Sequence, residues 1–137
     1  MTHQMTSVLR IEPRWTDLDP VGHVNNSVFL VYAEEARARF MRDAIPQTWG
    51  WVVVVHNAID YHHPAEMMDS LEVTSAVEKV GSSSFTTINV ICTVGGQRCA
   101  TVRTVQVVLK TDRSGTRPWT ADERAVLEGF LGAASAE

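Results

Sequence analysis

The stretch Asp17-Leu18-Asp19-Pro20-Val21-Gly22-His23-Val24-Asn25-Asn26 leads directly into a helical pattern that covers residues 29–44. The residue before Pro20 is pushed out of the α region toward extended geometry. The glycine two positions after this proline lets the chain reverse, and the two asparagines that end the stretch are of a type that caps helix N-termini. The stretch therefore predicts a strand end, a tight polar turn and the start of a long helix.

This turn also has a chemical meaning. Asp19 lies within a few residues of the N–H groups that open the expected helix. Those groups have no partner inside the helix and carry partial positive charge, which suits a developing oxyanion. The sequence thus predicts a carboxylate held close to polarising backbone amides.

The helix has one apolar face. Phe29, Ala33, Ala36, Phe40 and Ala44 follow steps of four, three, four and four residues, which is the spacing of a single helical face. The alanines in this stripe allow a close approach to a flat partner, for which a sheet is the natural candidate. The pattern predicts a helix packed across a sheet.

After this helix the apolar period changes from 3.6 to 2. We expect four consecutive strands joined by short turns, which makes them antiparallel neighbours. A short helix follows Thr120, because Thr120 and Glu123 have the spacing of a capping box. The expected strands cover residues 7–16, 52–61, 71–80, 84–94 and 98–110, and the short helix ends near 131. The prediction is one α+β domain over residues 1–137, with an antiparallel sheet wrapped around one long helix.

Composition excludes several classes of protein. The net charge is −4 and the sequence holds no Lys/Arg-dense run, which argues against a nucleic-acid partner. No apolar run approaches the roughly 20 residues that a membrane span needs. Residues 1–10 lack the basic start and apolar core of a signal peptide. We expect a cytoplasmic protein with neither a membrane nor a nucleic acid as partner.

Two cysteines flank an expected hairpin turn. Cys92 and Cys99 lie on either side of Gly95-Gly96, and a two-residue turn there would place them opposite each other. Their Cα atoms would then be close enough for a disulfide, but the expected compartment disfavours one. We expect two small buried apolar side chains.

A set of motifs follows in order along the chain. These motifs are Asp17-x-Asp19, His23-Val24-Asn25-Asn26, Phe29, Tyr32, Glu34-Glu35-Ala36-Arg37, Tyr61-x-x-Pro64 and Gly81-x-x-Ser84-Phe85. With this set the chain resembles the 4-hydroxybenzoyl-CoA thioesterase family, which are acyl-CoA thioesterases of the hot-dog fold. The resemblance covers about residues 7 to 110 and rests on the ordered set rather than on any one motif.

The resemblance implies a function and a site. Asp19 matches the catalytic carboxylate, and Asn26 matches the residue whose backbone N–H polarises the thioester carbonyl. The family forms homodimers or dimers of dimers, with sheets joined edge to edge and the active site at the subunit interface. It uses no metal or redox cofactor, so coenzyme A enters only as part of the substrate.

The residues themselves leave some roles open. Asp19 is either only a turn residue, since Asp before Pro is common in loops, or a catalytic carboxylate that attacks the thioester directly or activates a water. His23 either donates to substrate or to Asp19, or it only packs within the turn. Asn25 is expected to cap the helix and so to support the substrate site, whereas Asp17 is expected to be structural, paired with Arg14 or capping the turn.

Substrate contacts are expected from two regions. Phe29 and Tyr32 are candidates for the acyl group, together with Trp49 and Trp51. Relatives carry basic residues in the turn after the third strand, where this chain has Ser82 and Ser83. Contacts to the coenzyme phosphates are expected either from these serines and nearby backbone N–H groups or from Arg98, Arg113 or Arg117, and the sequence does not decide between them.

Other polar clusters favour simpler interpretations. Glu34 and Glu35 lie near arginines and are expected to form a charge network rather than to act in catalysis. His56, His62 and His63 are too loosely spaced for a metal site. Two other functions remain open, a non-catalytic module that binds acyl-CoA or acyl-carrier groups and a thioester hydratase or dehydratase, although the hydratase motif is absent.

Overall fold

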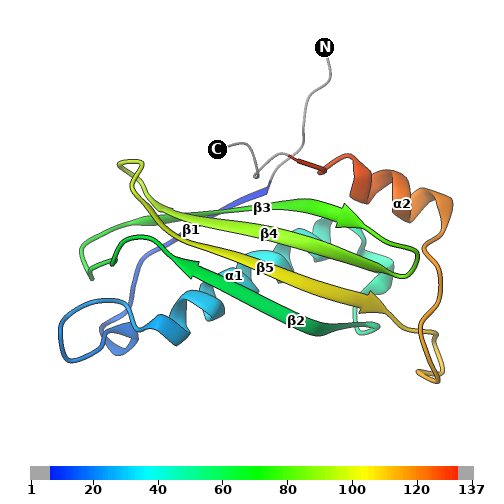
Figure 1. Cartoon of the computed structure of the whole chain (residues 1–137), viewed down its shortest axis with the longest axis horizontal. Coiled ribbons are helices and arrows are strands. Elements are labelled where there is room, and N and C mark those ends of the chain that lie inside the picture. The colour runs from blue at the N-terminus through cyan, green and yellow to red at the C-terminus, as the bar shows by residue number, and fades with distance from the viewer. Residues whose placement is uncertain (1–6, 133–137) are drawn as a thin grey trace, which may run out of the picture.

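The computed structural model describes residues 7–132, and it contains one antiparallel sheet, one long helix and one short helix (Figure 1). Residues 1–6, part of the segment considered for a signal peptide, lie outside this range. The elements are β1 (Ser7–Ile11), α1 (Asn26–Ala44), β2 (Val52–Tyr61), β3 (Leu71–Val80), β4 (Ser84–Thr93), β5 (Arg98–Val108) and α2 (Ala121–Glu128), with 3₁₀ turns η1 (Trp15–Asp17) and η2 (Pro46–Thr48).

The strand order corrects the expectation that the last four strands are sequential neighbours. The order in the sheet is β1-β3-β4-β5-β2, so β2 pairs with β5 at one edge and does not touch β3. The segment of residues 62–70 is too long for a tight hairpin, and it crosses the end of the sheet from β2 to β3. This crossing segment matters for function because it closes one side of the candidate site.

The helix α1 lies across the sheet (Figure 1), as its apolar face predicts. Phe29, Ala33, Ala36 and Phe40 are each at most 2 % exposed. The first three pack against apolar residues of β3, β4 and β5, including Val73, Ile91 and Val102. Phe40 belongs to a second apolar cluster, which also includes residues of α2. A sheet wrapped around one long helix is the hot-dog arrangement, so the α+β fold expectation is confirmed.

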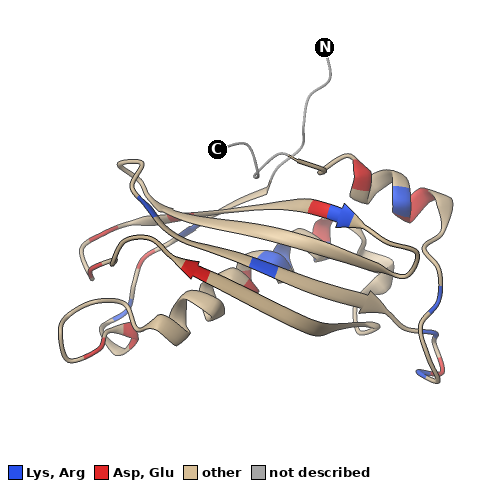
Figure 2. Ribbon diagram, viewed as in Figure 1, with Lys and Arg blue, Asp and Glu red and all other residues tan. Residues whose placement is uncertain are grey.

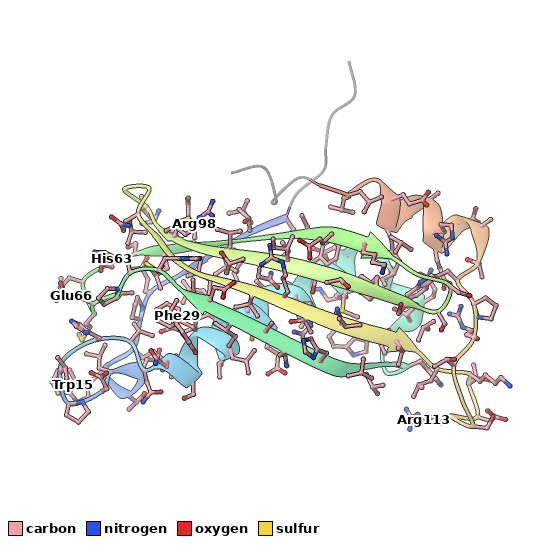
Figure 3. All side chains as sticks on the ribbon, in the orientation of Figure 1. Trp15, Phe29, His63, Glu66, Arg98 and Arg113 are labelled. Atoms are coloured by element: carbon pink, nitrogen blue, oxygen red, sulfur yellow. The ribbon has the colours of Figure 1, made fainter. Side chains whose placement is uncertain are left out.

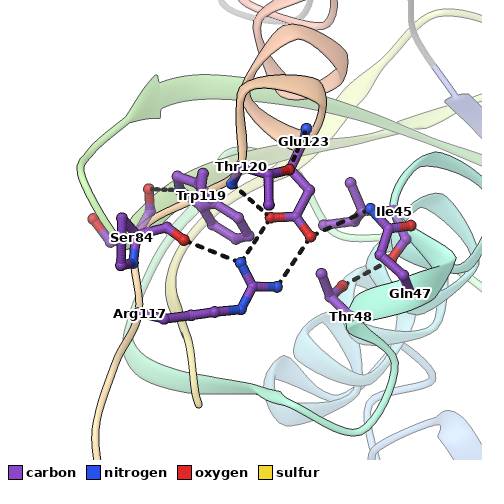
Figure 4. A network of polar contacts seen from close by, with 9 residues as sticks. Ile45, Gln47, Thr48, Ser84, Arg117, Trp119, Thr120 and Glu123 are labelled. Atoms are coloured by element: carbon purple, nitrogen blue, oxygen red, sulfur yellow. Dashed lines mark hydrogen bonds and ion pairs between the residues drawn. The ribbon is translucent and has the colours of Figure 1, made fainter. Parts of the chain in front are cut away.

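The short helix α2 is fixed to the far end of the sheet by a buried carboxylate (Figure 4). Glu123 is 2 % exposed and accepts two hydrogen bonds from Arg117, at 2.8 and 3.0 Å. Thr120 N–H also donates to this carboxylate, which completes the predicted capping box. The hydrogen bonds from Arg117 outweigh the effect of burial and lower the pKa of Glu123 to about 2.

The hairpin between β4 and β5 differs from the predicted one. Ile91 pairs with Ala100, but a register shift follows and Cys92 faces Arg98 instead of Cys99. The amide of Gly96, at φ +99°, donates to Thr93 O, so the turn is one residue longer than a two-residue loop. The two cysteines form no disulfide; Cys99 is fully buried as expected, whereas Cys92 is only partly buried.

Charged residues of both signs are spread over the loops, the strands and the two helices in the view of Figure 2. Within the described range, neither helix is long and apolar enough to cross a membrane.

Candidate active site

The turn that carries Asp19 is held by the carboxylate itself. Asp19 Oδ1 accepts hydrogen bonds from Val21 N–H at 2.9 Å and from His23 N–H at 3.1 Å. The backbone of Asp19 also bonds to His23, from Asp19 N–H to the His23 carbonyl. Within residues 7–132 no protein donor bonds to the second oxygen, Oδ2, so one oxygen orients the side chain and the other has no protein partner.

The helix α1 begins directly after this turn. Asn25 is the N-cap, and its Oδ1 accepts from Ser27 N–H at 2.9 Å, as the sequence predicts. Asn26 is the first helical residue, and among the described residues its N–H has no acceptor, as expected for the first amide of a helix. The site therefore offers an unused donor at the positive end of a 19-residue helix.

Asp19 and Asn26 line the same cleft, which has a volume of about 330 Å³. Phe29 forms part of its wall and stacks edge-on against Tyr61, with ring centroids 5.9 Å apart. The Tyr61 hydroxyl donates to the Asn26 carbonyl at 2.8 Å, which ties the end of β2 to the start of α1. The cleft thus combines a carboxylate, a free helix amide and an aromatic wall, and it lies at the left end of the molecule in Figure 3, where Phe29 and His63 are labelled.

The remaining wall of the cleft comes from the crossing segment after β2. His62, His63 and Pro64 line it, and the N–H groups of both histidines donate to Cys99 O. A second hollow of about 350 Å³ shares His23, His63 and Pro64 with the cleft and continues toward the β4–β5 hairpin. Sequence reasoning treated these histidines only as metal-ligand candidates, although the proline that ends β2 indicates where the chain leaves the sheet.

His23 belongs to the cleft wall, and its backbone supports Asp19. A β-bridge between His23 and Glu66 joins the Asp19 turn to the crossing segment. Two segments that are about 40 residues apart in the sequence therefore meet at the cleft, and His23 lies at their junction.

Asp17 is buried beneath the turn and not in the cleft. It is 2 % exposed, and its carboxylate accepts hydrogen bonds from Arg14 and from the Tyr32 hydroxyl. Burial alone would raise the pKa of Asp17, but these hydrogen bonds outweigh it and lower the pKa to about 2. The predicted structural pairing of Asp17 with Arg14 is confirmed.

Tyr32 occupies a place that the sequence does not indicate. The Tyr32 side chain is 5 % exposed, and its hydroxyl donates a hydrogen bond to Asp17 Oδ2 at 2.6 Å. Tyr32 therefore lies behind the cleft wall and does not line the cleft. Burial, followed by the bond to Asp17, raises the pKa of Tyr32. Its periodic position after Phe29 made it a candidate for acyl contact, but a long polar side chain on the apolar side of a helix also suits a buried hydrogen bond.

Ser82 and Ser83 lie at the other end of the sheet from the cleft within one chain. Tyr61, in the cleft, pairs with Ala100, whereas Ser84 pairs with Val107 at the opposite end of β5. Seven residues of extended strand span roughly 23 Å, so these serines do not reach Asp19 of their own chain. Trp49 and Trp51, which precede β2, are equally remote.

The three arginines considered for phosphate binding also lie at different ends of the sheet. Arg117 is engaged with Glu123, and Arg113 lies 5.6 Å from the Trp51 ring centroid, both away from the cleft. Arg98, at the start of β5, is at the cleft end of the sheet, and Figure 3 labels it near His63. Of these three arginines, Arg98 is therefore the one at the same end of the sheet as the cleft.

The glutamates of α1 form the expected charge network. Glu35 pairs with Arg39 at 2.6 Å, and Glu34 lies 3.6 Å from Arg37. Both glutamates are exposed, and neither lines the cleft. Among residues 7–132, no group of three or more His, Cys, Asp or Glu is placed to hold a metal ion.

Comparisons with known proteins agree on one family. A model of the thioesterase-like superfamily matches residues 13–129. A thioesterase of Thermus thermophilus, solved in complex with coenzyme A and zinc, is 31 % identical, covers 92 % of this chain and 95 % of its own, and has a TM-score of 0.81. A structure described as a predicted thioesterase from Bacillus stearothermophilus is 25 % identical, with coverages of 93 % and 97 % and a TM-score of 0.84.

A characterised relative is found by sequence. The long-chain acyl-CoA thioesterase FadM of Escherichia coli K12 is 32 % identical over 80 residues, which is 55 % of this chain and 61 % of FadM. The fold, the cleft and the family model together define a hot-dog thioesterase. The chain belongs to the thioesterase-like superfamily.

Proposed function

We propose that this protein hydrolyses an acyl-CoA thioester to a free acid and coenzyme A, with Asp19 as the catalytic carboxylate. The observation that carries the proposal is the pairing, in one cleft, of an Asp19 oxygen without a protein partner and an Asn26 amide without an acceptor, both within the part of the chain that the structure describes. These two groups can serve one thioester carbonyl, the carboxylate at its carbon and the amide at its oxygen.

The chemistry follows from their positions. As the carbonyl carbon is attacked, its oxygen gains negative charge, which the Asn26 N–H and the helix dipole stabilise. Removing one such donor from an oxyanion site typically costs about 10²–10³ in rate. The tetrahedral intermediate then collapses: the carbonyl re-forms, the C–S bond breaks, and the released coenzyme A thiolate takes up a proton.

Asp19 has two ways to start this reaction. As a general base it removes a proton from a water, whose oxygen then attacks the carbonyl carbon. As a nucleophile its free oxygen attacks directly and forms an anhydride with the acyl group, which water then hydrolyses. The free Oδ2 serves either route, and His23, beside it in the cleft wall, is the candidate to contact the substrate.

The aromatic wall supports an apolar acyl contact at Phe29. Coenzyme A is itself the leaving group, and the mechanism calls for no further cofactor.

Because Ser82 and Ser83 are remote from Asp19 of their own chain, they could contact the coenzyme phosphates only in the site of another subunit.

Mass analysis of the products separates the three candidate functions. With saturated and 2-enoyl-CoA substrates, a thioesterase yields the acid and free coenzyme A. A hydratase converts the enoyl-CoA to a hydroxyacyl-CoA that keeps its thioester, and a binding module returns every substrate unchanged. Either of the last two outcomes overturns the proposal.

Because the family is expected to form dimers with sheets joined edge to edge, we also propose a homodimer that pairs through the β2 edge. This proposal can be tested separately from the activity. β2 is an edge strand whose Val53, Val54 and Val55 are 42, 41 and 58 % exposed, and such an edge favours pairing with another strand. The double substitution Val53→Lys and Val55→Lys places charges on this edge and should convert a dimer into a monomer. Sedimentation should give twice the chain mass of 15.2 kDa for the wild type and once that mass for the variant.

The matched control is Val8→Lys, on the edge strand β1 at the other side of the sheet, where Val8 is 56 % exposed. This variant should remain dimeric. A wild-type protein that sediments as a monomer at assay concentration and still turns over substrate would rule out pairing along β2.

A further inference from the structure

We propose that Asp17 and Tyr32 act as a positioning pair, which sets the separation between the Asp19 carboxylate and the Asn26 amide. The inference rests on the proposed function, because the two groups that it positions are those of the proposed reaction. Neither Asp17 nor Tyr32 lines the cleft, so any effect on the reaction is indirect. The Tyr32 ring also contacts Phe29 of the cleft wall, with centroids 6.4 Å apart, and Tyr32→Phe keeps this ring contact.

The first half of the argument is the attachment of Asp17 to the body of α1. Its Oδ2 accepts the Tyr32 hydroxyl at 2.6 Å and Arg14 N–H at 2.9 Å, and its Oδ1 accepts Arg14 Nη2 at 2.9 Å. A short O–H···O⁻ bond of this kind is among the stronger hydrogen bonds in proteins. Because Tyr32 lies about two turns into α1, this hydrogen bond fixes the segment that contains Asp17 against the body of the helix.

The second half is the attachment of the same residue to the helix terminus. The Asp17 carbonyl accepts the N–H of Asn25, the N-cap, at 2.9 Å. A β-bridge between Leu18 and Val24 continues this contact toward the turn. Asp17 is two residues before Asp19, and Asn25, to which Asp17 is bonded, is one residue before Asn26. Asp17 therefore links the segment that carries the carboxylate to the segment that carries the amide.

Two points of attachment restrict more motion than one. The bond to Asn25 alone would let the loop pivot about the helix start, and the bond to Tyr32 removes that freedom. Misplacement of reacting groups by about 1 Å can cost about 10²-fold in rate. The expected loss on release of the Tyr32 bond is therefore in the chemical step and not in substrate binding.

The chain offers a matched control for a merely structural role. Glu123 is likewise a buried carboxylate, 2 % exposed, and it is bound by an arginine and a backbone N–H. It lies in the first turn of α2, at the other end of the sheet (Figure 4). Loss of its charge should lower stability as loss of the Asp17 charge does, without moving the cleft.

The experiment compares Tyr32→Phe, Asp17→Asn and Glu123→Gln with the wild type in steady-state hydrolysis of one acyl-CoA. Tyr32→Phe removes only the hydroxyl and keeps the buried ring, so it folds even if Asp17→Asn does not. We expect kcat to fall at least about tenfold in Tyr32→Phe, with KM within about twofold and an unchanged acidic limb in the pH profile of kcat. Glu123→Gln should lower the melting temperature and leave kcat within about twofold.

The outcomes separate this inference from the proposed function. If the wild type turns over, Asp19→Asn does not, and folded Tyr32→Phe keeps full kcat, the positioning role is wrong while the proposed function stands. An equal loss of kcat in Glu123→Gln also refutes it, because the effect would then follow general stability. A wild type without turnover on any acyl-CoA refutes both.

Discussion

Replacing Asp19 by Asn should lower kcat at least about a hundredfold, because general-base or nucleophilic assistance of this kind contributes about 10²–10⁴ in rate. The substitution is conservative for the fold. The amide oxygen of Asn can still accept the Val21 and His23 N–H bonds that hold the turn, whereas it is neither a base nor a competent nucleophile. Steady-state thiol release, with circular dichroism as the check on folding, measures the effect.

The two mechanistic routes differ in one further result. In a single turnover in H₂¹⁸O with enzyme in excess, label in the Asp19 carboxylate together with ¹⁶O in the product identifies a nucleophilic Asp19 whose anhydride is hydrolysed at the Asp19 carbonyl carbon. An unlabelled enzyme with ¹⁸O in the acid means that water attacked the acyl carbon, as it does with a general base or when the anhydride is hydrolysed at its acyl carbonyl. A folded Asp19→Asn protein that keeps the wild-type rate would remove Asp19 from the mechanism altogether.

Replacing Arg117 by Met should destabilise the fold by about 3 kcal/mol, since removing one partner of a buried ion pair leaves an uncompensated charge. The Glu123 side chain is 3 % exposed, so water cannot replace the lost hydrogen bonds. Urea denaturation measures the loss. The surface variant Arg39→Met, which breaks the exposed pair with Glu35, should cost less than about 1 kcal/mol.

The same pair predicts a pH dependence of stability. The folded-state pKa of Glu123 is lowered from 4.5 to about 2, so the folded state binds fewer protons than the unfolded state in this range. The stability from Glu123 is therefore fully present above about pH 4.5 and is lost as the pH falls toward 2. In Arg117→Met this loss between about pH 4.5 and 2 should become smaller, and equal slopes in the two proteins would contradict the assignment.

Local patterns in the sequence predict the elements but not their order. The helical stripe from Phe29 to Phe40 and the capping box at Thr120 depend on neighbouring residues, and the structure confirms both. The pairing of β2 with β5 is a long-range choice, made by where residues 62–70 travel after leaving the sheet. No local period encodes that path, so sequential pairing was the simplest expectation and was wrong.

The site shows the same division. The Asp19 turn, the Asn25 cap and the Asn26 amide lie within eight residues of one another, so their proximity follows from the sequence. The wall formed by Tyr61 and the histidines that follow depends on the crossing segment and was missed. The role of Tyr32 was missed for a related reason, since its partner Asp17 is fifteen residues away and buried only in the folded chain.

The most direct test of the central claim is release of free coenzyme A thiol from a panel of acyl-CoA substrates, followed with a thiol-reactive dye for wild type and Asp19→Asn side by side. The account predicts multiple turnovers by the wild type on at least one substrate, with acid and thiol formed in equal amounts, and loss of at least about a hundredfold in the variant. Thiol release at equal rates by the two proteins, or none by the wild type on any acyl-CoA, would contradict it.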